Sequence, residues 1–385
     1  MRALHVYRTY FPDSQGGLEE TIRQICVNTA PHGVKSSVLS LSSASDLSVI
    51  EREEATVYRA RKVAEVASCG MSLDAFALYR KLIKEHDIVH YHYPWPFADL
   101  LHFSTKKRHP SILTYHSDIV RQRMLGRVYR PLMNRFLNSV DRIVCTSPNY
   151  FATSEVLPDY TKKVEIIPIG LNETSYPAND DQADESTQEF GENYFFFIGV
   201  LRYYKGLHIL LDALKDAPYK AVIAGSGPTE QELKLQARQL KLDNVIFTGQ
   251  ISNRKKVSLI KGSRGIVFPS YMRSEAFGVT LLEGAMYGKP LISTEIGSGT
   301  SHVNVNGETG LVVPPGSSKA LREAMDQLHF HSSQARRMGQ CARARYEEHF
   351  TGELMGKRYF DVYGKLQEAA GSASVSNEPS LARGV

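Results

Sequence analysis

The chain has 385 residues, of which 42% are hydrophobic and 23% charged, so it has the composition of a soluble globular protein with room for two or three domains. Its formal net charge of +5 does not indicate nucleic-acid binding without a basic patch, and it suits either an anionic small substrate or a membrane surface. The widely spaced cysteines form no C-x-x-C pair and the N-terminus lacks a signal-peptide core, so we expect a cytoplasmic protein without a zinc site or disulfide framework.

Short apolar runs rich in β-branched and aromatic residues alternate with amphipathic stretches, and this pattern occurs twice along the chain. Several runs are apolar throughout, as expected of strands covered on both faces. The pattern predicts an α/β protein of two doubly wound, Rossmann-like domains that face an inter-domain cleft, with ligand sites at the carboxyl ends of the strands. The predicted strands cover 3–7, 34–41, 88–93, 111–116, 141–146 and 164–168 in the first half, and 194–200, 220–224, 245–248, 265–269, 290–294 and 311–313 in the second.

A polar, acidic segment over 172–192 separates the two halves and predicts domains over 1–171 and 193–350. Its acids at 180–185 belong either to a solvated linker or to a metal site, and the linker is favoured because no strand positions the carboxylates. Two further helices are predicted over 319–348 and 351–370, and the second is expected to pack back on the N-terminal domain. A disordered tail is predicted over 371–385.

Two strand ends of the first half carry candidate ligand-binding residues. Gly16 and Gly17 lie between the first strand and the first helix, where they either form a simple tight turn or let the backbone approach a phosphate or a sugar. His116 and Asp118 follow the strand 111–116. His116 is either a structural strand-end histidine or a hydrogen-bond partner of a transferring sugar, and Asp118 either orients that sugar or contacts the acceptor.

Two other segments of the first half are rich in aromatic or basic side chains. Segment 90–99 is dense in aromatic and imidazole side chains, and its Tyr93 and Trp95 suit sugar faces; it shows no carboxylate or third histidine at metal-ligand spacing. Residues 119–140 predict a basic amphipathic helix, kinked near Pro131, that either packs on the core with a solvated face or rests on anionic lipid. Its apolar positions are Val120, Met124, Val128, Leu132 and Phe136, and its arginines are Arg121, Arg123, Arg127, Arg130 and Arg135.

The strand 194–200 is followed by two cations, Arg202 and Lys205, ahead of a helix. They are either solvated surface cations or a pair that neutralises a pyrophosphate leaving group in place of a divalent metal. After strand 220–224, Gly225 and Gly227 make up half of a dinucleotide fingerprint. Glu230 stands where the third glycine belongs, which disfavours a dehydrogenase.

A buried-type strand over 265–269 leads through a loop into a helix that begins near Phe277 and Gly278. A helix start offers unpaired N–H groups and the positive end of a dipole, which suits a diphosphate, and Gly278 allows close backbone approach. Glu275 precedes this helix and Glu283 lies within it. The two acids are either favoured there by the dipole or act as ligands, with Glu283 binding the ribose hydroxyls and Glu275 the sugar.

Taken together, these motifs resemble those of the retaining glycosyltransferases of family four, which have the GT-B architecture, over about residues 1–350. The strongest part of the resemblance is the pair Glu275 and Glu283. Segment 199–206 meets the family's G-x-L-x-x-K-G pattern in part. Segment 167–172 resembles its I-P-N-G-V-D junction, with Ile169 in place of Asn and Asn172 in place of Asp.

The resemblance implies that the second domain holds most of a nucleotide-sugar donor, while glycines and a histidine reach across from the first domain. The family needs no D-x-D metal motif, and none stands at a strand end here, so we expect neither a metal nor another cofactor. The implied donor-binding residues are Gly16, Gly17, Gly199, Arg202, Lys205, Glu275, Phe277, Gly278, Val279 and Glu283; the catalytic ones are His116, Glu275, Arg202 and Lys205; and Tyr93, Trp95 and Asp118 lie on the acceptor side.

Segments 91–99 and 295–304 are similar to those of bacterial mannosyl- and rhamnosyltransferases of lipopolysaccharide O-chain assembly, which use GDP-sugars. The resemblance thus implies transfer of mannose or D-rhamnose to a lipid-linked glycan, by a protein peripheral to the inner face of the plasma membrane. Two rival hypotheses stay open: a UDP-sugar donor for the same chemistry, and a nucleotide-sugar-binding protein without turnover.

Overall fold

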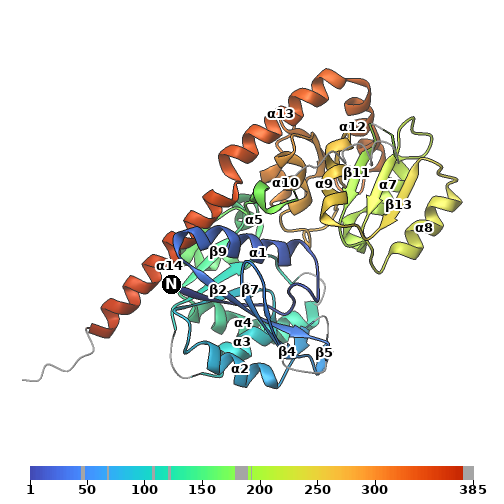
Figure 1. Cartoon of the computed structure of the whole chain (residues 1–385). Helices are drawn as coiled ribbons and strands as arrows, with labels where there is room; N and C mark the ends of the chain where they lie inside the picture. The colour runs from blue at the N-terminus through green and yellow to red at the C-terminus, as the bar shows by residue number, and fades with distance from the viewer. Residues whose placement is uncertain are drawn as a thin grey trace, which may run out of the picture.

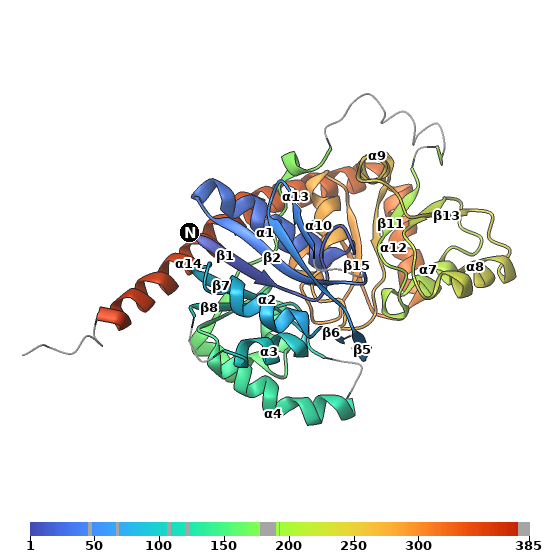
Figure 2. The same cartoon turned by 60° about the horizontal axis from the view of Figure 1, so that its bottom comes forward.

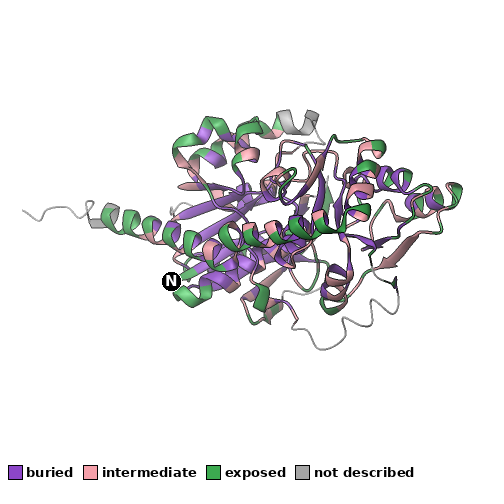
Figure 3. Ribbon diagram, turned by 90° about the horizontal axis from the view of Figure 1, so that it is seen from above, coloured by how far each residue is buried: buried purple, intermediate pink, exposed green. Residues whose placement is uncertain are grey.

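The computed structural model describes residues 1–44, 48–66, 69–105, 109–119, 123–177, 190–191 and 193–375. The chain forms two parallel-sheet α/β halves, and its long C-terminal helix runs back from the second half along the first (Figure 1). The central strands of both sheets are buried between helices, whereas the edge strands are partly exposed (Figure 3). The predicted class, two Rossmann-like domains, is confirmed.

The N-terminal sheet has the strand order β10-β9-β8-β7-β1-β2-β4-β3, and all its pairs are parallel except β3 with β4. A separate hairpin, β5 and β6, lies between β4 and β7 in the chain. The six predicted strands are present, whereas β3 to β6 were not predicted. The bounds are β1 Arg2–Val6, β2 Lys35–Ser42, β3 Ser48–Glu51, β4 Thr56–Arg61, β5 Ala64–Val66, β6 Cys69–Met71, β7 Ile88–Tyr93, β8 Ser111–Tyr115, β9 Arg142–Cys145 and β10 Val164–Ile166.

Helices cover both faces of this sheet: α1 and α14 pack on one, and α2, α3 and α4 lie on the other (Figures 1 and 2). Their bounds, with the neighbouring short helices, are α1 Gly17–Thr29, η1 Ala30–His32, α2 Asp74–Leu82, α3 Pro96–Phe103, α4 Arg123–Ser139, α5 Pro148–Thr153, η2 Leu157–Lys163 and α14 Gly352–Val375.

The C-terminal sheet is parallel throughout, with the order β13-β12-β11-β14-β15-β16. Successive strands run outward in opposite directions from the β11–β14 pair, and this is where α/β sheets open a ligand crevice. The corresponding pair in the first sheet is β1 and β7. The bounds are η3 Glu173–Ser175, β11 Phe195–Ile198, η4 Tyr203–Lys205, α7 Leu207–Ala213, β12 Ala221–Ala224, α8 Glu230–Gln239, β13 Val245–Gly249, α9 Asn253–Gly262, β14 Gly265–Phe268, α10 Val279–Met286, β15 Leu291–Thr294, α11 Thr300–Val303, β16 Gly310–Val313, α12 Ser318–Phe330 and α13 Ser332–His349.

The chain crosses between the two halves twice, and the crossings lie side by side. Leu171 on the outgoing segment forms a β-bridge with Thr351 on the returning one, and the Tyr346 hydroxyl donates to the Leu171 carbonyl over 2.8 Å. The returning chain continues as α14, which lies against α1 on the N-terminal half. The two halves are thus joined by one compact double crossing.

Several expected boundaries differ in the structure. The helix predicted over 319–348 is two helices, α12 and α13, which break at His331. Residues 371–375, predicted as disordered tail, belong to α14, and 376–385 lie outside the described residues. The start of the predicted linker is ordered, since η3 covers Glu173–Ser175 and Tyr176 is buried. The acid cluster at 180–185 lies outside the described residues.

Helix α4 is present and contains Pro131, but its buried face differs from the predicted one. Of the predicted apolar positions, Phe136 is buried but Val128 is 81% exposed. Met133, Leu137 and Val140, which were not among the predicted positions, are buried in the second half of the helix and just beyond it. A spacing of three and four residues keeps one side of a helix facing the core, while a strict spacing of four drifts around the axis. None of the described helices is long and apolar enough to span a membrane.

The contact between α14 and α1 depends on a glycine. A Cβ atom on Gly356 would lie 2.1 Å from the Asn28 carbonyl oxygen, whereas one on Gly364, further along the same helix, would meet nothing within 4 Å. We predict that Gly356→Ala lowers the free energy of unfolding by about 1–3 kcal/mol through overpacking. The matched control Gly364→Ala is expected to raise it by about 0.5–1 kcal/mol through helix propensity.

Chemical unfolding of the two variants, followed by circular dichroism, measures both effects. Equal stability of the two variants would contradict the assigned packing.

Candidate active site

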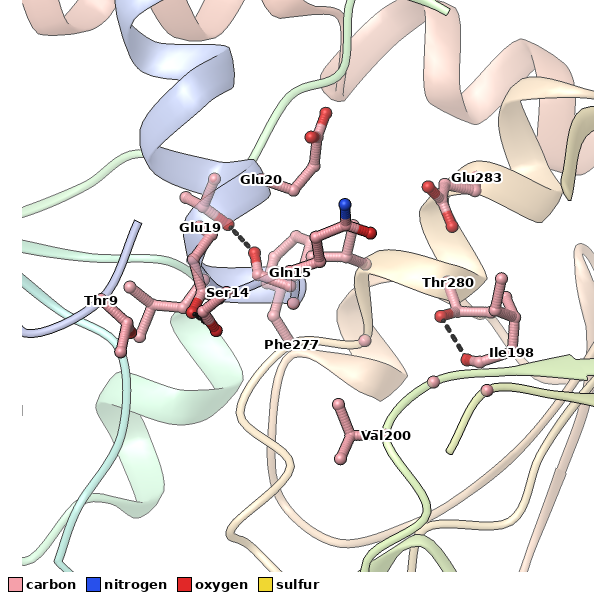
Figure 4. A pocket seen from close by; sticks show the side chains of 18 of the residues that line it. Thr9, Ser14, Gln15, Glu19, Glu20, Ile198, Val200, Phe277, Thr280 and Glu283 are labelled. Atoms are coloured by element: carbon pink, nitrogen blue, oxygen red, sulfur yellow. Dashed lines mark hydrogen bonds between the residues drawn. The ribbon is translucent and has the colours of Figure 1, made fainter. Parts of the chain in front are cut away.

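A cavity of about 820 Å³ lies between the two halves, at the carboxyl ends of both sheets. Its wall combines loops after β1 and β8 of the first half with loops after β11, β12, β13 and β14 of the second. In Figure 4, Glu19 and Glu20 extend from α1 on one side, while Thr280 and Glu283 extend from α10 on the other. The predicted inter-domain location of the site is therefore where the structure has its cavity.

The charged side chains along this wall favour an anion. Among the described residues that line the cavity, six cations face four carboxylates, which leaves two positive charges. A nucleoside diphosphate carries roughly two to three negative charges at neutral pH, so the wall suits a diphosphate ester. The cations are Arg8, Arg23, Arg52, Arg202, Lys205 and Lys256, and the acids are Glu19, Glu20, Glu275 and Glu283.

Helix α10 begins at the cavity, as its sequence predicts. Gly278 caps it with a φ of 88°, in the left-handed region that favours glycine. The first N–H groups of a helix have no partner within the helix, and here Phe277, Gly278 and Val279 all line the cavity. The Thr280 hydroxyl donates to the Ile198 carbonyl over 3.0 Å and ties this helix start to the end of β11 (Figure 4).

Helix α1 presents a second N-terminus to the same cavity. Gly16 is its N-cap, and Ser14 donates to Glu19 over 2.7 Å within the preceding loop (Figure 4). A Cβ atom on Gly17 would lie 3.5 Å from Cγ2 of Val279, so the two helix starts approach each other across the domain boundary. Both glycines line the cavity, and a diphosphate between these helix starts meets two positive dipole ends.

Lys205 and Glu275 come together, as neighbouring loops at the β11–β14 pair require. The Lys205 ammonium hydrogen-bonds the Glu275 carboxylate and lies 4.6 Å from the centre of the Phe268 ring. Both charged side chains are 12% exposed, so this ion pair stands at the cavity wall rather than in solvent. Arg202 is exposed beside it and Gly199 lines the same wall.

Glu283 is also held by partners that the sequence did not indicate. Its Oε1 accepts hydrogen bonds from the Lys256 ammonium at 2.6 Å and from the Tyr176 hydroxyl at 3.1 Å. Lys256 belongs to a run of cations on α9 that reads as a solvated face, and Tyr176 lies in the segment predicted as a linker. The contact of either residue with Glu283 follows from the three-dimensional structure and not from a sequence pattern, because helix α9 and the ordered start of the linker converge on α10.

His116 lines the cavity and is 7% exposed. Burial lowers its pKa to about 3, so the imidazole is neutral at physiological pH. Its Nε2 lies 3.0 Å from Nδ1 of His92, which is buried behind it. His116 can therefore face a substrate as a neutral, oriented ring.

The residues predicted for the acceptor side do not line the cavity. Tyr93 stacks on Tyr115 in the core and donates to the Met133 sulfur, and the buried Trp95 donates to the Gly70 carbonyl over 3.1 Å. Both rings are occupied in core packing, so direct acceptor contact does not fit their positions.

Asp118 instead connects the two halves. It accepts a hydrogen bond from the Arg273 guanidinium at 3.1 Å, and Arg273 also donates to the Gly297 carbonyl. The role of orienting the sugar does not fit this ion pair, which instead holds the halves together beside the cavity.

The glycines after β12 have a structural explanation. A Cβ atom on Gly225 would lie 2.1 Å from the Gly199 carbonyl oxygen, and one on Gly227 would lie 2.5 Å from the Leu201 carbonyl oxygen. Because these glycines have no side chain, the loops after β11 and β12 can pack together. This packing explains the two glycines without a role in dinucleotide binding.

Both halves of the chain match models of one enzyme class. Residues 15–174 match the model described as Glycosyltransferase Family 4, and residues 179–345 match the model described as Glycosyl transferases group 1. Among solved structures, the fold is similar to a sucrose-phosphate synthase from Thermosynechococcus elongatus, with a TM-score of 0.79 and 20% identity over 96% of this chain and 99% of that one. It is also similar to the Anabaena HepE protein in complex with UDP and glucose, with a TM-score of 0.75 and 17% identity over 95% of this chain and 100% of that one.

Two curated relatives are much more similar in sequence. The chain is 52% identical to the D-rhamnosyltransferase WbpZ of Pseudomonas aeruginosa, over 91% of this chain and 92% of that protein. It is 43% identical to the O-antigen chain mannosyltransferase C of Escherichia coli, over 96% of this chain and 100% of that protein. With both halves matched and relatives this similar over nearly their full length, the chain belongs to glycosyltransferase family 4 and is a glycosyltransferase of the GT-B fold.

Proposed function

We propose that this glycosyltransferase transfers mannose or D-rhamnose, with retention, from a GDP-sugar to a lipid-linked glycan during synthesis of a lipopolysaccharide O-chain or another surface polysaccharide. The choice of sugar and acceptor is supported by the two similar relatives, a D-rhamnosyltransferase and an O-antigen chain mannosyltransferase. A nucleoside-diphosphate sugar as donor is supported by the cavity between two helix N-termini, whose wall has two excess positive charges.

In this proposal the diphosphate lies at the start of α10, where unpaired N–H groups, Lys205 and Arg202 meet it. As the bond between the sugar's anomeric carbon and the phosphate oxygen breaks, negative charge grows on the leaving diphosphate. Fixed positive groups stabilise that charge more in the transition state than in the ground state. These residues supply the charge that a metal ion supplies in other enzymes, and the proposal includes no metal or other cofactor.

Retention follows from attack on the face that the leaving group departs from. The Glu275 carboxylate, which pairs with Lys205 in this structure, is assigned to the sugar hydroxyls and not to the anomeric carbon. In our proposal the acceptor hydroxyl oxygen bonds to the anomeric carbon while the bond to phosphate breaks, and the hydroxyl proton passes to a phosphate oxygen. Glu275 and His116 hydrogen-bond the sugar, and Glu283 binds the ribose hydroxyls.

The acceptor side of the proposal places the protein at the inner face of the plasma membrane. Helix α4 bears the exposed Val128, Arg130 and Arg135, a combination that suits an anionic lipid surface. Arg135 also lies 4.8 Å from the centre of the Phe103 ring, so part of its side chain packs on the protein. Arg121 lies outside the described residues, as do the side chains of Arg123 and Arg127.

A donor screen tests the nucleotide. A ligand at 100 times its Kd stabilises the folded state by about 2.7 kcal/mol, so GDP is expected to raise the melting temperature more than UDP at equal concentration. GDP-mannose or GDP-D-rhamnose is then expected to give a product with a lipid-linked acceptor in a mass-spectrometric assay. A larger shift with UDP, together with transfer from a UDP-sugar, would assign the donor to the rival class. If nucleotide sugars bind but none is transferred or hydrolysed, the rival hypothesis of a binding protein without turnover would hold.

A charge deletion tests the leaving-group role. We predict that Lys205→Ala lowers kcat about 100- to 1,000-fold with the fold intact, because it removes a fixed charge from the departing diphosphate. Lys234→Ala serves as the control, since Lys234 also pairs with a glutamate, Glu230 at 2.7 Å, but lies outside the cavity wall. Its expected effect on kcat is within about twofold. Turnover near the wild-type value in Lys205→Ala would refute the role of this lysine.

A further inference from the structure

Behind His116, the first half carries a row of histidines that no step of the proposed reaction uses. His5 on β1 and His90 on β7 are register partners on adjacent strands, and His92 follows two residues along β7. Their side chains lie on the sheet face that α1 and α14 cover. Toward the amino ends of the strands this face is apolar, with Ala3, Ile88 and Ile112, and toward the cavity it becomes polar.

Three of these rings form a continuous hydrogen-bonded chain that ends at the cavity. Nδ1 of His5 lies 3.0 Å from Nε2 of His92, and Nδ1 of His92 lies 3.0 Å from Nε2 of His116. The ring planes differ by only 19° and 21°, with centroids 5.4 and 5.3 Å apart, so the rings meet edge to edge. This is the geometry in which a nitrogen lone pair faces an N–H group.

All three imidazoles are neutral. Burial holds the pKa of His5 and the pKa of His116 at about 3, and it lowers the pKa of His92 well below its usual value. A neutral imidazole has one N–H donor and one bare acceptor nitrogen. Because His92 is bonded through both nitrogens, it donates at one and accepts at the other, so both hydrogen bonds point the same way along the chain.

The surroundings of His5, at the inner end of the histidine chain, determine which way these hydrogen bonds point. Nε2 of His5 is buried and has no hydrogen-bond partner among the described residues. If the bonds pointed inward, this nitrogen would carry an N–H group without a partner in the core, and such buried donors are rare. If they point outward, only a lone pair is left there. The outward direction makes His5 donate to His92 and His92 donate to His116.

We propose that His5 and His92 are positioning residues that fix His116 in the Nδ1–H tautomer, so that it offers a hydrogen-bond donor to the sugar oxygen in the cavity. In this arrangement Nε2 of His116 accepts from His92, and its proton is on Nδ1. Nδ1 has no partner among the described residues, and the His116 side chain lines the cavity. The inference deepens the proposed function, because it assigns how the sugar-facing histidine is oriented.

A metal ion among His5, His90 and His92 fits the geometry less well. Both nitrogens of His90 are already engaged, with the Tyr363 hydroxyl and the Thr114 hydroxyl at 2.7 Å each. A metal would displace these bonds as well as the bond between His5 and His92. The same observation makes His90 a matched control. It is as buried as His92 and stacks on it at 4.3 Å, but neither of its hydrogen bonds belongs to the series that joins His5, His92 and His116.

The tautomer is measured directly by NMR on the full chain with ¹⁵N-labelled histidine, in the absence of any donor. His116→Gln assigns the His116 signal among the 13 histidines. We expect the two-bond correlations of His116 to show the Nδ1–H form in the wild type. In His92→Phe we expect a mixture with the Nε2–H form, whereas His90→Phe leaves the His116 pattern unchanged. A wild-type His116 in the Nε2–H form would overturn the proposal whether or not His92→Phe and His90→Phe fold.

Kinetics give the functional readout. His92→Phe is expected to lower kcat about 10- to 100-fold while changing the KM for the donor little, because a misoriented group near the reacting centre affects mainly the transition state. His90→Phe, with a comparable loss of core contacts, is expected to keep kcat. Equal losses of kcat in both variants would assign a merely structural role to His92. The NMR result does not depend on which sugar nucleotide is the donor, so the two proposals can fail separately.

Discussion

The start of α10 faces the start of α1 across the domain boundary, and the other features of the site depend on this approach. Two positive dipole ends point into one cavity, which favours an anionic ligand but repels the two halves from each other when the cavity holds no charge. The carboxylates of Glu275 and Glu283 are each paired with a lysine, Lys205 and Lys256, so they leave most of that positive potential in place. A diphosphate arriving between the helix starts supplies the negative charge itself.

The rest of the fold holds these helix starts in place. Parallel strands put every functional loop at one edge of each sheet, and the double crossing at Leu171 and Thr351 turns those edges toward each other. The pair of Asp118 and Arg273 adds a second connection beside the cavity. Tyr176, in the ordered start of the inter-domain segment, donates a hydrogen bond to Glu283. The segment that joins the two halves therefore also contacts the cavity wall.

Much of this arrangement can be predicted from the sequence. The hydrophobic periodicity indicates the helices and strands, and the carboxyl ends of the parallel strands indicate where the ligand site lies. The twelve expected strands and the start of α10 at Gly278 are present, and the predicted donor-side residues share one cavity. Predictions failed where a residue type suits two environments. Tyr93 and Trp95 resemble sugar-binding rings but fill the core. No sequence pattern indicates Lys256, which binds Glu283. The short strands β3 to β6 carry no long apolar run, and the histidine chain needs three strands to be seen as one unit.

The most direct test of the account is a crystal structure of the protein with GDP. We expect the diphosphate to lie at the start of α10, within hydrogen-bond distance of the Val279 backbone N–H and of the Lys205 ammonium, with the ribose hydroxyls on Glu283. We also expect Lys205 to turn from Glu275 toward the phosphate. A diphosphate bound at the Gly225–Gly227 loop, away from both helix starts, would contradict it.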